Sequence, residues 1–428
     1  MKIFVNCVLW MLLVTASMCR AVEPSPASVQ PAAEGFSAAR LARLGSFMQS
    51  LTDSGAYLGA VTLVSRDGKI VDWHTYGYRD LAKKSPMAKD TIFKIYSMTK
   101  TIASVAVLTL MEEGKLTLDD PVERFLPEFS NMKVFTGGTA DAPQLRPAAR
   151  AITVRHLLTH TSGFATSGKP GDEAVALFNR FDLHTSPTLK AYAEYVARQP
   201  LALDPGEQFN YDGVSLEVLS RLIEVVSALP FDVFLQRRIL DPLQMSDTGF
   251  TVPVAKRQRI ADLVTTTTDG KLAIAAVHHA KFPGEMLNPY PSGAGGLYST
   301  AMDYLRFCQM LLNGGTLDGV SILGRKSVDL MMMNHLPRSD ASASPSNQAE
   351  GFGLGGYVVL DVSRRGRLGS VGQFGWSGAA STYYTIDRQE NLIAILLMQH
   401  LPQGLPKDPP KVSVKFYNFV YQSLVARQ

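Results

Sequence analysis

The spacing of apolar residues predicts strands near both ends of the chain and helices between them. Residues 60–65 and 69–76 are typical of two strands, and Asp67 and Gly68 between them indicate a hairpin. Three further strands are expected late in the chain, at 356–362, 382–386 and 392–398.

Helices are expected where apolar residues recur at helical spacing. Ser37 is a candidate N-cap for an amphipathic helix that includes Leu41, Leu44 and Leu51. A strongly apolar helix is expected to begin at Ser97 and to continue to residue 111, before Gly114. The other expected helices cover residues 118–126, 153–158, 189–198, 216–227, 231–240, 301–312 (with Ser299 as its cap) and 412–426.

This order of elements predicts an α/β fold of the α+β type. The simplest architecture is one antiparallel sheet built from both ends of the chain, flanked by N- and C-terminal helices, with a large helical region inserted. We expect the α/β part at about 36–100 and 300–428 and the helical part at about 101–299. An active site would lie in the crevice between the two parts.

Composition and charge fit an ordinary globular protein with a substantial core. Of the 428 residues, 46% are hydrophobic and 19% are charged, far from the composition of disordered chains. The formal net charge of +4 is spread over the whole length, and no block of Lys or Arg resembles a nucleic-acid footprint. We therefore expect a small-molecule partner and no nucleic acid, and the oligomeric state stays open.

The first residues are typical of a secretory signal. Lys2 is followed by an apolar run broken only by Asn6, and small residues precede a cut site after Ala21. The run is short for a bilayer span, which disfavours the alternative of an uncleaved anchor. We expect residues 1–21 to be removed, 22–35 to form a linker, and the domain at 36–428 to be exported, to the periplasm or the medium, without stable membrane insertion.

The cysteines and histidines do not indicate a disulfide or a metal site. Cys7 and Cys19 would leave with the signal, so Cys308 alone would remain. His156 and His160 have the spacing of a zincin pair but lack its glutamate. We expect neither a metal nor a cofactor.

Ser97 and Lys100 form a Ser-x-x-Lys pair at the start of the apolar helix. Residues three apart on a helix share one face, so the lysine nitrogen can reach the serine oxygen. A serine hydroxyl needs a neighbouring base to become a nucleophile, and a desolvated ammonium releases its proton more readily. The helix N-terminus would also favour an oxyanion that develops beside Ser97.

The motif alone is weak, because Ser130 and Lys133 form a second pair. That pair follows Pro127 and precedes Gly137 and Gly138, with no sustained apolar helix behind it. We expect it to be a solvated loop.

Other segments of the chain strengthen the interpretation of Ser97 as a nucleophile, because together they resemble the serine β-lactamase-like superfamily. The resemblance is to the branch that joins class C β-lactamases, D-alanyl-D-alanine peptidases and family VIII carboxylesterases, and it runs from about Gly59 to the C-terminus. The matching segments besides 97–100 are 90–93 (DTIF), 113–116 (EGKL), 155–163 (RHLLTHTSG), 205–211 (PGEQFNY), 241–245 (DPLQM), 295–300 (GGLYST) and 351–355 (GFGLG). The resemblance implies a β-lactamase/transpeptidase-like fold and an acyl-enzyme on Ser97.

The resemblance also implies a proton carrier, Tyr211. Its phenol would act with Lys100 to take the Ser97 proton and return it to the leaving group. Which of Lys100 and Tyr211 is the formal base stays open. His160 lies in a segment whose family counterpart has a structural role, so we leave it out of the catalytic set.

The family's third element, a strand beside which acyl substrates lie, matches Trp376, Ser377, Gly378 and Ala379. The resemblance implies that the backbone N–H groups of Ser97 and Ala379 form the oxyanion hole. Glycine at 378 would let the strand backbone approach the substrate closely.

Two departures from β-lactamases favour an ester substrate. Trp376 stands where those enzymes usually carry a lysine that holds the drug's carboxylate, and Gly213 stands where they commonly carry an asparagine. The segment around Trp376 is most similar to family VIII carboxylesterases. We therefore expect a serine hydrolase of carboxylic esters, with short acyl chains.

Other functions stay open at this point. The first alternative is a cephalosporin-hydrolysing β-lactamase or a D-alanyl-D-alanine carboxypeptidase, and the second is a penicillin-binding sensor that acylates without turnover. An α/β-hydrolase is disfavoured because the chain has no Gly-x-Ser-x-Gly pentapeptide.

Overall fold

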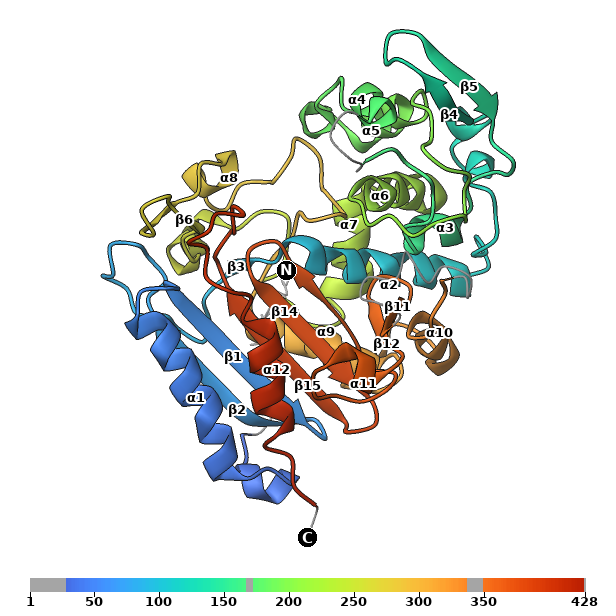
Figure 1. Cartoon of the computed structure of the whole chain (residues 1–428). Coiled ribbons are helices and arrows are strands. Elements are labelled where there is room, and N and C mark those ends of the chain that lie inside the picture. The colour runs from blue at the N-terminus through green and yellow to red at the C-terminus, as the bar shows by residue number, and fades with distance from the viewer. Residues whose placement is uncertain (1–27, 167–171, 337–348, 427–428) are drawn as a thin grey trace, which may run out of the picture.

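The computed structural model describes residues 28–166, 172–336 and 349–426. The expected signal at 1–21 lies outside these residues. At the centre is an antiparallel sheet of seven strands in the order β11-β12-β13-β14-β15-β1-β2 (Figure 1). Its strands are β1 (Gly59–Arg66), β2 (Lys69–Gly77), β11 (Glu350–Phe352), β12 (Tyr357–Val359), β13 (Phe374–Gly378), β14 (Thr382–Asp387) and β15 (Leu392–Met398).

The two early strands join the late ones because β1 pairs with β15, with Thr62 opposite Leu396. Every residue of both strands is buried. A strand covered on both faces has no need to alternate apolar with polar residues, which explains the unbroken apolar sequence of β15. The predicted antiparallel sheet is confirmed.

Helices cover both faces of this sheet. The helices α1 (Ala38–Asp53) and α12 (Ser413–Tyr421) lie side by side on one face (Figure 1). Ser37 caps α1 as expected, since its side chain accepts from the Arg40 N–H. On the other face lies α9 (Ala301–Leu312), which packs on β1, β14 and β15.

The inserted region contains the apolar helix α2 (Thr99–Glu112) and the buried helix α6 (Val214–Ser227), which contact each other. The remaining helices are α3 (Val154–Leu158), α4 (Glu173–Phe178), α5 (Leu189–Val196), α7 (Phe231–Leu235), α8 (His278–Lys281), α10 (Arg325–Met331) and α11 (Val362–Arg365). Four small two-stranded sheets complete the described chain: β3 (Phe93–Lys94) with β8 (Tyr298–Ser299), β4 (Lys133–Gly138) with β5 (Pro143–Pro147), β6 (Val264–Thr266) with β7 (Leu272–Ile274), and β9 (Thr316–Leu317) with β10 (Val320–Ser321).

The helix expected at 118–126 is wrong. Only a short 3₁₀ turn, Val122–Arg124, forms there. Pro121 lacks an N–H and keeps the preceding residue out of helical geometry. The Asp120 side chain instead accepts from the Thr117 N–H, and Val122 N–H donates to the Ile152 carbonyl.

Other boundaries also differ from the expectation. Thr300, not Ser299, caps α9, because Ser299 pairs with Phe93 in the β3–β8 sheet. The strand expected at 356–362 ends at Val359, and α12 is shorter at both ends than the helix expected at 412–426. The hairpin β4–β5 was not expected, because its exposed strands carry little apolar patterning.

Residues 28–35, the described part of the expected linker, lie against β2. Ser28 forms a bridge with Ile70, and Glu34 pairs with Lys69 at 2.6 Å between Oε1 and Nζ. Arg66 donates to the backbone carbonyls of Glu34 and Gly35. This segment is therefore docked on the sheet.

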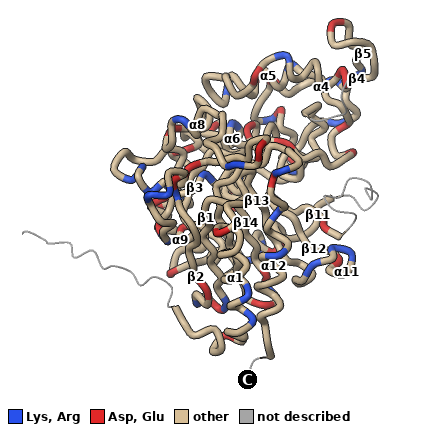
Figure 2. The backbone as a smooth tube through the Cα atoms, turned by 60° about the vertical axis from the view of Figure 1, so that its left-hand side comes forward, with Lys and Arg blue, Asp and Glu red and all other residues tan. Residues whose placement is uncertain are grey.

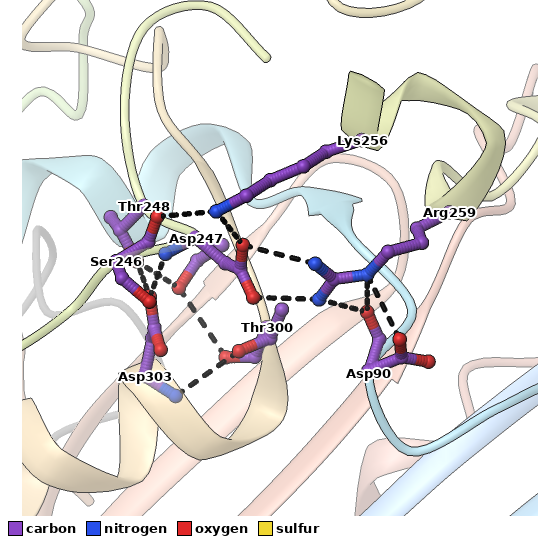
Figure 3. Close-up of polar contacts among 9 residues, drawn as sticks. Asp90, Ser246, Asp247, Thr248, Lys256, Arg259, Thr300 and Asp303 are labelled. Atoms are coloured by element: carbon purple, nitrogen blue, oxygen red, sulfur yellow. Dashed lines mark hydrogen bonds and ion pairs between the residues drawn. The ribbon is translucent and has the colours of Figure 1, made fainter. Parts of the chain in front are cut away.

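Lys and Arg are interspersed with Asp and Glu over the described surface (Figure 2). One charge cluster holds the segment that leads to β3 (Figure 3). Asp247 accepts from Lys256 Nζ at 2.7 Å and from Arg259 Nη2 at 2.6 Å, and Arg259 also donates to the Asp90 carbonyl. Behind it, the Asp247 N–H donates to Asp303.

This cluster predicts a pH-dependent loss of stability in Asp247→Asn. Burial raises the pKa of the Asp247 carboxyl, but the hydrogen bonds from Arg259 and Lys256 outweigh burial and hold that pKa below its usual value. A carboxyl whose pKa is lower in the folded than in the unfolded state stabilises the fold at any pH above its unfolded-state pKa. This stabilisation is lost as the pH falls through the folded-state pKa. We expect Asp247→Asn to lower the free energy of unfolding at pH 7 by about 1–3 kcal/mol, with a smaller difference below about pH 4. Urea titrations at several pH values measure the free energy of unfolding. Asp232→Asn, which changes an exposed aspartate, is the control. A loss of stability in Asp247→Asn that does not depend on pH would contradict the prediction.

Candidate active site

Ser97 lies in a tight turn between β3 and α2. A 3₁₀ turn, Tyr96–Met98, precedes α2, so the helix proper begins two residues later than expected. Tyr96 has a φ of 45°, a left-handed backbone that is uncommon for an aromatic residue. Such strained residues cluster at functional sites.

Lys100 lies beneath Ser97, one helical turn further on. Its side chain is buried, at 4% exposure for the residue. Its Nζ donates to Ser97 Oγ at 3.2 Å and to the backbone carbonyl of Ala294 at 2.6 Å. The nitrogen also lies 5.1 Å from the centre of the Tyr211 ring. The expected contact between serine and lysine is therefore present.

Tyr211 lies three residues before the first residue of α6 and is exposed, at 37%. Its hydroxyl accepts from the indole N–H of Trp376 at 3.1 Å, and the two ring centres are 5.0 Å apart. Behind Tyr211, the buried His160 ring lies 4.7 Å away. Burial lowers the pKa of His160, although its hydrogen bond to Asp212 opposes the shift. A neutral imidazole thus packs behind the phenol.

The strand β13 brings Trp376, Ser377 and Gly378 to the same place. A Cβ on Gly378 would lie 2.3 Å from the Ile95 carbonyl oxygen. Only glycine therefore allows the strand to pass so close to the turn that carries Ser97, and Ala379 follows directly. Close approach to backbone explains this glycine within the structure itself.

A crevice of about 330 Å³ opens above these residues. All the expected site residues except Lys100 line it, and Lys100 contacts Ser97 from below. The other lining residues are Tyr57, Ser381, Tyr383, His400, Pro402, Pro409 and Lys411. Ser97 also lines a second hollow, of about 510 Å³, whose walls include Phe178, Phe181 and Tyr192.

The second Ser-x-x-Lys pair lies elsewhere. Ser130 follows a 3₁₀ turn and is exposed, and Lys133 begins β4. Neither lines the crevice. The structure thus brings Ser97, and not Ser130, together with the other expected site residues.

Sequence reasoning missed two groups near Lys100: the carbonyl of Ala294 and the buried carboxyl of Glu217 in the second hollow. A backbone carbonyl has no signature of its own. The cluster Gly293, Gly295 and Gly296 was the available signal, because glycines often mark close backbone approach.

Within the described ranges, no group of three or more His, Cys, Asp or Glu side chains is arranged to hold a metal ion. None of the helices in the described part of the chain is both long enough and apolar enough to span a bilayer.

A family model described as beta-lactamase matches residues 44–413. The chain belongs to the beta-lactamase family. It is accordingly an enzyme of the serine hydrolase type, with the β-lactamase/transpeptidase-like fold.

Among relatives of this beta-lactamase-family chain, an uncharacterised protein of Mycobacterium tuberculosis is 34% identical over 363 residues, which cover 83% of this chain and 89% of the relative. The lovastatin esterase of Penicillium rubens is 31% identical over 379 residues, covering 82% and 91% of the two chains. Among solved structures, EstCE1, described as a hydrolase with promiscuous acyltransferase activity, matches with a TM-score of 0.75 and 25% identity, covering 90% of this chain and 99% of its own.

The hydrogen bond between Trp376 and Tyr211 should affect the reactivity of the site. Trp376→Phe keeps an aromatic ring but removes the N–H donor, and one neutral hydrogen bond is worth about 1 kcal/mol. We expect the rate at which a fluorophosphonate probe labels the enzyme to fall about fivefold. Trp73→Phe, in β2 and outside the crevice, is the matched control, and an unchanged labelling rate in Trp376→Phe would contradict the prediction.

Proposed function

We propose that this enzyme hydrolyses carboxylic esters with short acyl chains, through an acyl-enzyme on Ser97. The observation that carries the proposal is the placement of Lys100 Nζ 3.2 Å from Ser97 Oγ, at the base of a crevice that Tyr211 and residues 376–379 also line. This placement supports Ser97 as the nucleophile and Lys100 as its activating base.

In the proposed reaction, Ser97 Oγ attacks the ester carbonyl carbon while its proton passes to Lys100 in its neutral amine form or to Tyr211 as the phenolate. The tetrahedral oxyanion accepts from the backbone N–H groups of Ser97 and Ala379, each worth about 3 kcal/mol in the transition state. As the C–O bond to the alcohol breaks, Tyr211 or Lys100 returns the proton to the alcohol oxygen. Water then attacks the acyl-enzyme by the same proton route, releasing the acid and Ser97.

Three features support an ester over a β-lactam. Trp376 occupies the position of the usual lysine, and its indole N–H is engaged by Tyr211. Gly213 has no side-chain amide with which to hydrogen-bond the side chain of a β-lactam. The lovastatin esterase and the hydrolase EstCE1 are similar over most of the chain.

The crevice that residues 376–379 line has a volume of about 330 Å³, and the rings of Tyr57 and Tyr383 are among its walls. A crevice of this size supports a short acyl chain.

The proposal predicts selective ester turnover. We expect p-nitrophenyl butyrate to be hydrolysed with a higher kcat/KM than p-nitrophenyl laurate or a chromogenic cephalosporin. Ser97→Ala should lose about a thousandfold or more in kcat. Ser130→Ala is the matched control for the second motif and should behave as the unsubstituted enzyme.

One observation favours a second candidate, a β-lactamase or D-alanyl-D-alanine carboxypeptidase. Lys411 lines the crevice and could hold the carboxylate that such substrates carry. Cephalosporin turnover well above ester turnover, reduced in Lys411→Ala, would replace the esterase proposal with this one. A single acylation burst without turnover would indicate a sensor instead.

We also propose that the chain is exported after cleavage of residues 1–21, to the periplasm or the medium. The sequence features of a secretory signal support this. N-terminal sequencing of the protein from a secreting host should begin at Val22. Recovery of the intact N-terminus in the membrane fraction would contradict it.

A further inference from the structure

A buried carboxyl, Glu217, lies in the hollow beside Ser97. It belongs to α6, which begins three residues after Tyr211, and it is only 3% exposed. Its direct hydrogen-bond partners are neutral groups of one turn of chain, residues 292–294. Burying a carboxylate is costly unless its oxygens are satisfied, so these contacts are the reason that it can stay there.

The same turn joins Glu217 to the proposed catalytic lysine. At one end, the Ser292 hydroxyl donates to Glu217 Oε1 and the Gly293 N–H donates to Oε2 at 3.1 Å. At the other end, the Ala294 carbonyl accepts from Lys100 Nζ at 2.6 Å. The carboxyl is thus linked to the ammonium through a single short stretch of backbone.

Packing leaves this turn little freedom. A Cβ on Gly293 would lie 2.0 Å from Ser220 Oγ and 3.2 Å from the Leu216 carbonyl, both on α6. The chain beyond the turn then reaches the start of α2, where Leu297 N–H donates to Thr99 Oγ1. The turn is therefore clamped between α6 and the segment that carries Ser97.

We propose that Glu217 is a positioning residue for this enzyme: its carboxylate holds the 292–294 turn so that the Ala294 carbonyl keeps the Lys100 ammonium against Ser97. The inference rests on the proposed function, because it assigns Glu217 a task only if Lys100 activates Ser97. The Ser292 hydroxyl and the Gly293 N–H are buried donors, and each needs an acceptor. The Glu217 carboxylate supplies it.

The charge of Glu217 makes this role testable by pH. Burial raises its pKa to about 7, against the hydrogen bond from Ser292, the positive charge of Lys100 and the backbone N–H groups. The titratable groups whose charges act with it are Lys100 from α2, Tyr192 from α5 and Tyr290. Burial raises the pKa of both tyrosines, so they stay neutral near pH 7.

Protonation of Glu217 would convert one acceptor oxygen into a donor. The charge-assisted hydrogen bonds from the Ser292 hydroxyl and the Gly293 N–H would become weaker neutral ones, so the 292–294 turn would loosen. Activity should therefore fall as pH decreases through about 7.

The test compares Glu217→Ala and Glu217→Gln with the unsubstituted enzyme. For p-nitrophenyl butyrate we expect Glu217→Ala to lower kcat about 100-fold, since small displacements of catalytic groups have effects of this size, with KM changed far less. Glu217→Gln resembles the protonated carboxyl, so its kcat/KM should lack the acid limb near pH 7 and stay at the low-pH value of the unsubstituted enzyme. Glu224→Ala, which removes another α6 carboxylate that pairs with Arg221, should keep the normal kcat and pH profile.

The outcomes separate this inference from the proposed function. A folded Glu217→Ala with normal kcat would overturn the inference. If Glu217→Ala does not fold, the pH profile of Glu217→Gln decides, and a profile equal to that of the unsubstituted enzyme would overturn it. Hydrolysis that survives in Ser97→Ala would instead remove the proposed function, whereas an inactive Ser97→Ala with unaffected Glu217 variants would remove the positioning role alone.

Discussion

The burial of the Lys100 ammonium is the constraint on which the arrangement of the site depends. A cation withdrawn from water needs oxygen or aromatic partners, and an unsatisfied one would cost several kcal/mol. Here the partners come from three separate parts of the chain: the hydroxyl of Ser97, the carbonyl of Ala294 and the ring of Tyr211. Because these three groups are far apart in the sequence, the charge is satisfied only once residues 97, 211 and 294 have been brought together by the fold.

An aromatic wall surrounds that charge on the side of the sheet. Trp376 projects from β13 and lies edge to face with Phe352, with ring centres 5.1 Å apart and planes at 89°. Its indole N–H is directed at the Tyr211 hydroxyl, and His160 packs behind. This wall places aromatic rings against Tyr211, and its indole N–H is the group that fixes the position of the phenol oxygen.

The parts of this site that local geometry determines could be predicted from the sequence. The contact between Ser97 and Lys100 follows from their spacing, which the helix preserves even though a 3₁₀ turn precedes it. The strand with Trp376 and the loop with Tyr211 were located by family resemblance, and the structure brings them together. Their chemical roles remain predictions.

Tertiary contacts explain what the sequence could not show. Glu217 occupies a helix position that by composition alone suggests a solvated face, and only packing against residues 292–294 makes it a buried acceptor. The hydrogen-bond partner of the Trp376 indole could likewise not be predicted, because the direction of a side chain depends on neighbours that are distant in sequence. The helix wrongly expected at 118–126 shows the opposite case, where a local proline overrides an apolar pattern.

The pairing of β1 with β15 has a consequence for how this enzyme comes into being. Ala60 lies opposite Met398, so more than nine tenths of the 428 residues must be synthesised before these two strands can pair along their full length. Folds dominated by such distant contacts form slowly, because the entropy of closing a long loop is lost before any contact offsets it. A nascent chain that lacks its last strands therefore cannot form the crevice. The site around Ser97 stays incomplete until the final segment has been synthesised.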